Sequence, residues 1–199
     1  REIIRWVIFL KKYTYLLIIA SVFILNKSFS QTINGTCQNA LPFCTGMTFN
    51  YQAGVNTGTA KVGPDYTCLY SQPNPVWYYL LIAQPGAIDI HIQSYPGNYD
   101  VDFACWGPFT STANCGNLTS LNTIDCSYSS SYQEDCNIPS AQMGEYYIFM
   151  ITNYSNQLTN IAFSQTNTGQ IGSGSANCGA VANFSGNFFL DSNGNSIHD

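Results

Sequence analysis

Short apolar runs separated by turn residues are the feature that most restricts the fold of this chain. The run VWYYLLIA (76–83) and the run AIDIHIQS (87–94) are joined by the turn sequence QPG, in which Pro presets φ and Gly tolerates a positive φ. In the second run, isoleucines alternate with polar residues, the pattern of a strand with one buried face. We expect the two runs to pair as a β-hairpin.

Similar runs follow along the chain, among them VDFACWG, LTSLNTIDC, EYYIFMITN and TNIAFSQT. Gly, Pro, Asn and Ser separate them, and no long stretch has the 3.6-residue period of an amphipathic helix. About seven strands at turn-punctuated spacing predict an all-β fold, an antiparallel β-sandwich of jelly-roll or Greek-key type.

The first thirty residues have the pattern of a secretory signal peptide (1–30). Lys11 and Lys12 precede an apolar run from Tyr13 to Leu25, and small residues follow it. That run is shorter than the roughly 20 apolar residues of a membrane-spanning helix. We expect cleavage before Gln31 and no stable membrane insertion afterwards.

The charge of the mature chain excludes several partners. After cleavage, Lys61 is the only Lys or Arg, against ten acidic residues (the 11 of the whole chain less Glu2). Such a chain cannot form the basic stripe that grips phosphates. Nucleic acid and anionic membranes are therefore poor partners, whereas cations and neutral, hydroxyl-rich ligands fit the charge.

An even number of cysteines in an exported chain predicts disulfides and a secreted or cell-surface location. The sequence has eight and contains no C-x-x-C spacing. We expect four disulfides among Cys37, Cys44, Cys68, Cys105, Cys115, Cys126, Cys136 and Cys178. Short loops make Cys126–Cys136 and Cys105–Cys115 the first pairings to expect.

The composition changes after the last β-type run. Residues 167–180 are rich in Gly and Ser, a composition that predicts a linker. A new run, VANFSGNFFL, then leads into DSNGNSIHD. We therefore expect a β-sandwich domain at 31–166, a linker at 167–180 and the truncated start of a second β module at 181–199.

Several of these segments together resemble a known domain family. GPDYTCLYSQPNPVWYYLLIAQPGAIDIHI, DVDFACWGPF, NIPSAQMGEYYIFMITNYSN and TNIAFSQT are similar to the N-terminal domain of large, adhesin-like secreted Bacteroidota proteins, which often carry gliding-motility or type IX secretion sorting domains. That domain looks like a relative of the bacterial pre-peptidase C-terminal domain, a jelly-roll β-sandwich. The resemblance implies a non-catalytic surface module of a multidomain protein.

Asp100 and Asp102 are the strongest candidate site. Two positions apart on a strand, they share a face, with about 7 Å between their Cα atoms, and Val101 and Phe103 take the other face. Three interpretations stay open: a glycosidase pair, calcium ligands, or aspartates that stabilise a loop. As calcium ligands they would need further oxygens, from Asn98, backbone carbonyls or Asp65.

Aromatic residues offer a second type of site. Tyr95 and Tyr99 flank a Pro-Gly turn beside Asp100 and could cover the apolar face of a surface glycan, unless they only line strand faces. Trp77 and Trp106 lie inside β-type runs, which favours core positions. His91 sits on the polar face of its strand and, without a nucleophile motif, is expected to be an ordinary exposed histidine.

The final stretch, DSNGNSIHD, has the spacing of a calcium loop. Its oxygen ligands would come from positions one, three, five, seven and nine, and the alternative is a polar turn. These positions are Asp191, Asn193, Asn195, the carbonyl of Ile197 and Asp199.

Together these features predict a non-enzymatic extracellular module that acts in attachment or as a spacer, with calcium as its cofactor. The predicted partners are a surface glycan or protein ligand and the downstream domains of the same chain. The alternative is an ancillary domain, carbohydrate-binding or pro-peptide-like, of a secreted hydrolase.

Overall fold

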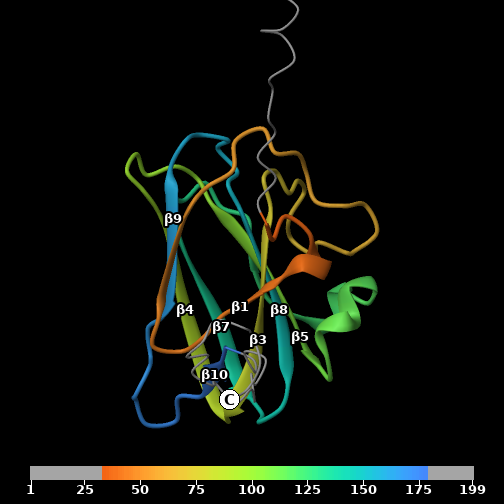
Figure 1. Cartoon of the computed structure of the whole chain (residues 1–199), viewed down its shortest axis with the longest axis vertical. Coiled ribbons are helices and arrows are strands. Elements are labelled where there is room, and N and C mark those ends of the chain that lie inside the picture. Colours follow the sequence, from red (N-terminus) through yellow and green to blue (C-terminus); the bar gives the residue numbers. More distant parts are fainter. Residues whose placement is uncertain (1–32, 179–199) are drawn as a thin grey trace, which may run out of the picture. The chain divides into compact units, whose positions relative to one another are not determined.

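The computed structural model describes residues 33–178 as an all-β domain (Figure 1). The signal peptide predicted at 1–30 and the calcium loop predicted at 191–199 lie outside these residues. Within 33–178, no helix has the length and apolarity needed to cross a membrane.

Ten strands and three short 3₁₀ turns make up the domain. The strands are β1 (Leu41–Pro42), β2 (Thr48–Gln52), β3 (Val76–Gln84), β4 (Gly86–Tyr95), β5 (Asp102–Phe109), β6 (Thr123–Ser127), β7 (Gln133–Ala141), β8 (Tyr146–Thr152), β9 (Asn160–Gln165) and β10 (Ser175–Asn177). The turns are η1 (Cys37–Asn39), η2 (Thr112–Gly116) and η3 (Ser120–Asn122).

The strands form two sheets that pack face to face, as the sequence predicted. One sheet has the order β1-β3-β8-β5-β6, with β10 also paired to β3, and the other has the order β2-β9-β4-β7. All pairs are antiparallel except that of β1 with β3. Figure 1 shows β4 and β9 in one layer and β3, β5 and β8 in the other.

The predicted hairpin of β3 and β4 is wrong. Both strands exist, but β3 pairs with β8 whereas β4 pairs with β7 and β9 in the other sheet. Only Pro85 separates them, which is one residue too few for a two-residue hairpin loop, and the chain crosses from sheet to sheet instead. Gly86 has a φ of 141°, and a Cβ there would clash with the backbone of Gly172 and Gly174.

The larger sheet is buried on both faces. Its inner face packs against the other sheet through residues such as Phe103 and Phe149, and its outer face carries a second apolar cluster. The turns η1 and η2 and the long loop before β3 cover that cluster. Trp77 and Trp106 stack there with ring centroids 5.9 Å apart, each at most 2% exposed, so their predicted core positions are confirmed.

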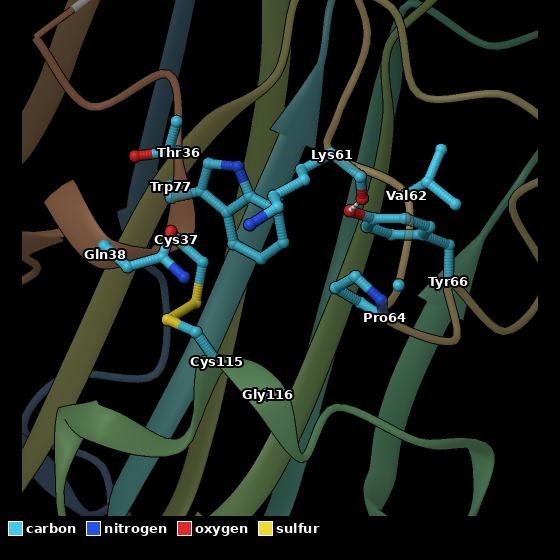
Figure 2. Close-up of a pocket in the computed structure, with 11 residues that line it drawn as sticks. Thr36, Cys37, Gln38, Lys61, Val62, Pro64, Tyr66, Trp77, Cys115 and Gly116 are labelled. Carbon is cyan, nitrogen blue, oxygen red and sulfur yellow. Dashed lines mark hydrogen bonds between the residues drawn. A yellow bond between two sulfur atoms is a disulfide. The ribbon is translucent and has the colours of Figure 1, made fainter.

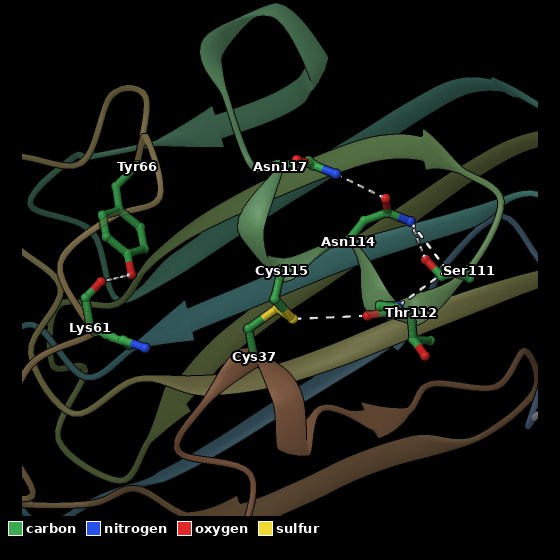
Figure 3. The surroundings of a disulfide bond; sticks show 9 residues. Cys37, Lys61, Tyr66, Ser111, Thr112, Asn114, Cys115 and Asn117 are labelled. Atoms are coloured by element: carbon green, nitrogen blue, oxygen red, sulfur yellow. Dashed lines mark hydrogen bonds between the residues drawn. A yellow bond between two sulfur atoms is a disulfide. The ribbon is translucent and has the colours of Figure 1, made fainter.

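The predicted disulfide pairings are also wrong. The structure joins Cys37 to Cys115, Cys44 to Cys178 and Cys68 to Cys126, and leaves Cys105 and Cys136 as buried thiols. Short loops were a poor guide, because these bridges connect segments 58 to 134 residues apart. Figure 3 shows how the first of them ties η1 to η2.

Part of the predicted linker is folded into the sandwich. Residues 175–177 form β10 on β3, and Cys178 is bonded to Cys44 near the start of the domain. Asn167 donates to the carbonyl of Ala87 at 3.0 Å. The small residues of this segment allow its turns to approach the backbone where the chain crosses from β3 to β4. The described domain therefore extends at least to Cys178.

The pairing leads to a direct chemical prediction. The mature protein, unfolded without reductant, should titrate as two thiols per chain, Cys105 and Cys136. In the native state neither should react, since both are buried and burial raises the pKa of the Cys136 thiol well above its ordinary value. Finding no thiol after unfolding would contradict the structure, because it would require a fourth disulfide.

Candidate functional site

The Asp100–Asp102 segment lies where β5 begins, at one end of the outer face of the larger sheet. Asp102 is the first residue of β5 and is directly opposite Thr152 at the end of β8. Val101 and Phe103 point into the inner core, so the predicted division between the two faces is confirmed. Asp102 therefore lies on the same face of β5 as Ala104 and Trp106, which belong to the outer cluster.

The two aspartates line a small cavity with polar atoms that have no partner. The cavity has a volume of about 130 Å³ and is lined by Asp100, Asp102 and the loop residues Tyr128, Ser129, Ser130 and Tyr154. Asp102 is only 1% exposed. One oxygen of each carboxylate, Asp100 Oδ1 and Asp102 Oδ2, is buried without a hydrogen bond, and so is Thr152 Oγ1.

The backbone around the pair is fixed by neighbouring loops. The Asp100 N–H donates to Ser155 Oγ at 2.9 Å, and the Val101 N–H donates to the carbonyl of Ser131 at 3.0 Å. Ser129 Oγ donates to Glu134 Oε1 at 2.5 Å beside them. The positions of both aspartates are therefore set by two loops, which converge from β6–β7 and from the end of β8.

Electrostatics show that this cavity disfavours the charged carboxylates. Burial, and then the neighbouring Asp100 and Glu134, raise the pKa of Asp102 to about 7. Burial and then Glu134 also raise the pKa of Asp100. Burial of the carboxylates is the main cause of both shifts, and close anions without a counter-ion add to it. A bound cation would supply the missing positive charge.

The donor set fits a hard cation better than a transition metal. Within 33–178, no three His, Cys, Asp or Glu side chains gather as metal ligands, so protein ligands here would be two carboxylates and neutral oxygens such as Thr152 Oγ1. Calcium accepts such all-oxygen sets. The glycosidase alternative would need room for a sugar between the carboxylates, whereas both side chains line one cavity of about 130 Å³.

The two additional ligands considered from the sequence lie elsewhere. Asp65 accepts the backbone N–H groups of Thr67 and Ser120, at 2.9 and 3.0 Å, and these bonds lower its pKa. It ties a loop to η3 and is not part of the cavity. Asn98 is exposed in the turn before Asp100, with a φ of 51°, and it too is absent from the cavity lining.

Tyr95, Tyr99 and His91 make local contacts outside the cavity. The Tyr95 hydroxyl accepts a hydrogen bond from Asn50 Nδ2, and the Tyr99 ring lies against Gly97 in the turn. His91 Nδ1 is 2.7 Å from Asp135 Oδ1 on the neighbouring strand β7. The predicted glycan platform of Tyr95 and Tyr99 therefore does not include the aspartate cavity.

Different tyrosines stand at the cavity, and the sequence analysis did not single out Tyr128 or Tyr154. Their rings meet edge to face with centroids 5.3 Å apart, and the Tyr128 hydroxyl donates to that of Tyr154 at 3.1 Å. Both lie in Ser- and Asn-rich sequence, CSYSS and TNYSN. A tyrosine in such a polar loop, unlike one in a β-type run, is not explained by packing on a strand face. This context could have identified both tyrosines as candidate site residues.

A larger cavity of about 220 Å³ lies beside the Cys37–Cys115 disulfide (Figure 2). Figure 2 shows the Lys61 side chain extending toward the Trp77 indole, and Tyr66 donates to the Lys61 carbonyl at 2.6 Å. Trp77 is only 2% exposed and stacks on Trp106, so little of its ring is accessible to a ligand. The aspartate cavity, with unpartnered charged oxygens, is the stronger candidate.

Comparisons with known proteins find likenesses among solved structures. No family model and no curated protein matches the chain. Among solved structures, it is similar to the pre-peptidase C-terminal domain of collagenase from Bacillus anthracis, with 14% identity, a TM-score of 0.41 and coverage of 64% of this chain and 94% of that one. This is the domain type that the sequence resembles, but a likeness of this size assigns no activity. The Bacteroidota adhesin context stays a prediction.

The raised pKa of Asp102 predicts a pH-dependent stability in the absence of divalent cations. The folded state holds a proton that the unfolded chain releases, between the ordinary pKa of 3.8 and about 7. This residue therefore lowers the free energy of unfolding progressively as the pH rises through that window. Asp102→Asn should remove that decrease, which urea denaturation with chelator at about pH 4.5 and about pH 8 would measure. If the free energy of unfolding fell by the same amount between the two pH values in wild type and in Asp102→Asn, the raised pKa would not belong to Asp102.

Proposed function

We propose that this chain is a non-enzymatic extracellular β-sandwich module of a larger exported protein, and that a calcium ion bound at Asp100 and Asp102 stabilises it. In this role the module acts in attachment or as a spacer between other domains. The observation that carries the proposal is the set of buried, unpartnered oxygens of Asp100, Asp102 and Thr152.

Buried polar atoms normally have hydrogen-bond partners, and an unpaired buried charge is costly. Here, one oxygen each of Asp100 and Asp102 lacks a partner at the cavity. The hydroxyl of Thr152, directly opposite Asp102 on the neighbouring strand, also lacks a partner. A calcium ion would satisfy them together and offset the repulsion among Asp100, Asp102 and Glu134. Calcium is favoured over magnesium because it tolerates irregular coordination by a mixed set of oxygens.

The cysteine chemistry supports an extracellular location. Three disulfides form among residues 37–178, and such bonds persist in oxidising compartments. Calcium is also abundant enough outside cells to fill weak sites in extracellular modules. The same module would also suit the alternative role, an ancillary domain of a secreted hydrolase. The two roles differ only in the kind of protein to which the module belongs.

The proposal predicts calcium-dependent stability. Calcium in about hundredfold excess over its dissociation constant should raise the melting temperature by about 5 to 10 °C relative to chelator. Asp102→Asn should abolish most of that rise. Asp135→Asn is the matched control, since this exposed aspartate pairs with His91 and lies outside the cavity. Differential scanning calorimetry gives the measurement.

Equal melting temperatures in calcium and chelator, for the wild-type protein, would overturn the calcium proposal. Binding should also release protons near neutral pH, because Asp102 is partly protonated there before the ion binds. Titration calorimetry in two buffers of different ionisation enthalpy would detect this release. Calcium binding without any proton release would place the ion at other residues.

A further inference from the structure

Three tyrosines form a partly exposed rim around the aspartate cavity. We define the tyrosine rim as Tyr70, Tyr128 and Tyr154. Tyr128 contacts both others edge to face, with centroid distances of 5.6 Å to Tyr70 and 5.3 Å to Tyr154. Because Tyr128 and Tyr154 line the cavity, the rim is continuous with its mouth.

Tyr70 is the most exposed member of the rim. Its side chain is 91% exposed, and that of Tyr154 is 39% exposed. The preceding residue, Leu69, is 5% exposed and packs in the outer cluster. The fold thus buries the neighbour of Tyr70 and presents the Tyr70 ring to solvent next to the cavity.

The short segment that carries Tyr70 is attached to the rest of the domain on both sides. Cys68 is bonded to Cys126 in β6, close to Tyr128 in sequence. The Gln72 carbonyl accepts the Ala60 N–H at 3.0 Å. A ring held on a cross-linked loop is already positioned before any ligand arrives, which reduces the entropy cost of binding.

The protein alone leaves calcium under-coordinated at this site. Calcium takes about six to eight oxygens, more than Asp100, Asp102 and Thr152 supply. The remaining positions would face the mouth of the cavity, where the rim lies. They are available to oxygens of water or of a ligand.

Charge restricts which ligand can supply those oxygens. With calcium bound, the ionised Asp100 and Asp102 balance the charge of the ion, and the neighbouring Glu134 leaves a net negative charge. Lys61 is the only Lys or Arg in the part of the chain that the structure describes. Lys61 lines the other cavity. An anionic ligand would be repelled, whereas neutral hydroxyl groups can bind calcium at little electrostatic cost.

We propose that the tyrosine rim and the cation bind a neutral sugar unit, with two adjacent hydroxyls on the calcium and an apolar ring face against Tyr70. A pyranose presents both surfaces side by side, and aromatic rings cover its apolar face while oxygens meet its hydroxyls. This inference rests on the proposed calcium site. It names the ligand class that the module would use in attachment.

The main competing ligand is a cationic side chain of a protein partner. An ammonium group could also enter an acidic, tyrosine-lined cavity, but it would take the place of the calcium. The two ligands therefore depend on calcium in opposite ways. Sugar binding needs the ion, whereas ammonium binding is inhibited by it.

The test uses the secreted protein and the methyl pyranosides of mannose, galactose and glucose, each alone. Saturation-transfer NMR should show a response for at least one of them in calcium and none in chelator. Tyr70→Ala should weaken that binding about three- to tenfold, while Tyr70→Phe, which keeps the ring, should retain most of it. Both variants should bind calcium like wild type, because Tyr70 contributes no calcium ligand.

Each outcome separates this inference from the proposed function. Calcium binding without a response from any of the three sugars would overturn the inference and leave the calcium proposal standing. A sugar response that persists in chelator, or that is unaffected by Tyr70→Ala, would also overturn it. Methylammonium binding that calcium suppresses would identify the cationic partner instead. Absence of calcium binding would remove both proposals.

Discussion

The burial of the larger sheet on both of its faces is the constraint on which the rest of this structure depends. Successive residues of β5 alternate between two apolar clusters, with Phe103 and Cys105 toward the other sheet and Ala104 and Trp106 toward the loops. A sheet covered on one side by loops needs those loops held in place. Two of the three disulfides do this, since Cys37–Cys115 and Cys68–Cys126 lie in the outer cluster and anchor the segments that cover it.

The aspartate cavity follows from where that outer face ends. Asp102 occupies the position that another apolar residue would take in the row of Ala104 and Trp106, and it is as deeply buried as they are. A carboxylate in such a place must be neutralised, paired or bound to a cation. Thr152 opposite and the rim tyrosines supply neutral oxygens and aromatic rings but no positive charge, and this combination is why we propose a cation.

The strands of the sandwich follow a local pattern, which explains what could be predicted. Runs such as 145–153 and 159–166 became β8 and β9 almost unchanged. The run of β9 alternates between buried and half-buried residues, and that of β8 is continuously apolar because both of its faces are buried. The sequence analysis did not predict β7, because only Cys136, Ile138 and Ala141 are buried in this strand and it has no apolar run. Pairing is not local, so the β3–β4 connection and the disulfides were predicted wrongly. The aspartate pair was identified, but its neighbours at the cavity come from separate loops that no spacing in the sequence brings together.

The most direct test of the central claim is terbium luminescence, because terbium occupies calcium sites and emits when a nearby tyrosine is excited. Terbium at Asp100 and Asp102 would lie beside Tyr128 and Tyr154. The account predicts tyrosine-sensitised emission that calcium displaces and that Asp102→Asn removes. Emission that survives Asp102→Asn but disappears with Asp191→Ala would place the ion in the predicted C-terminal loop, and it would contradict the assignment made here.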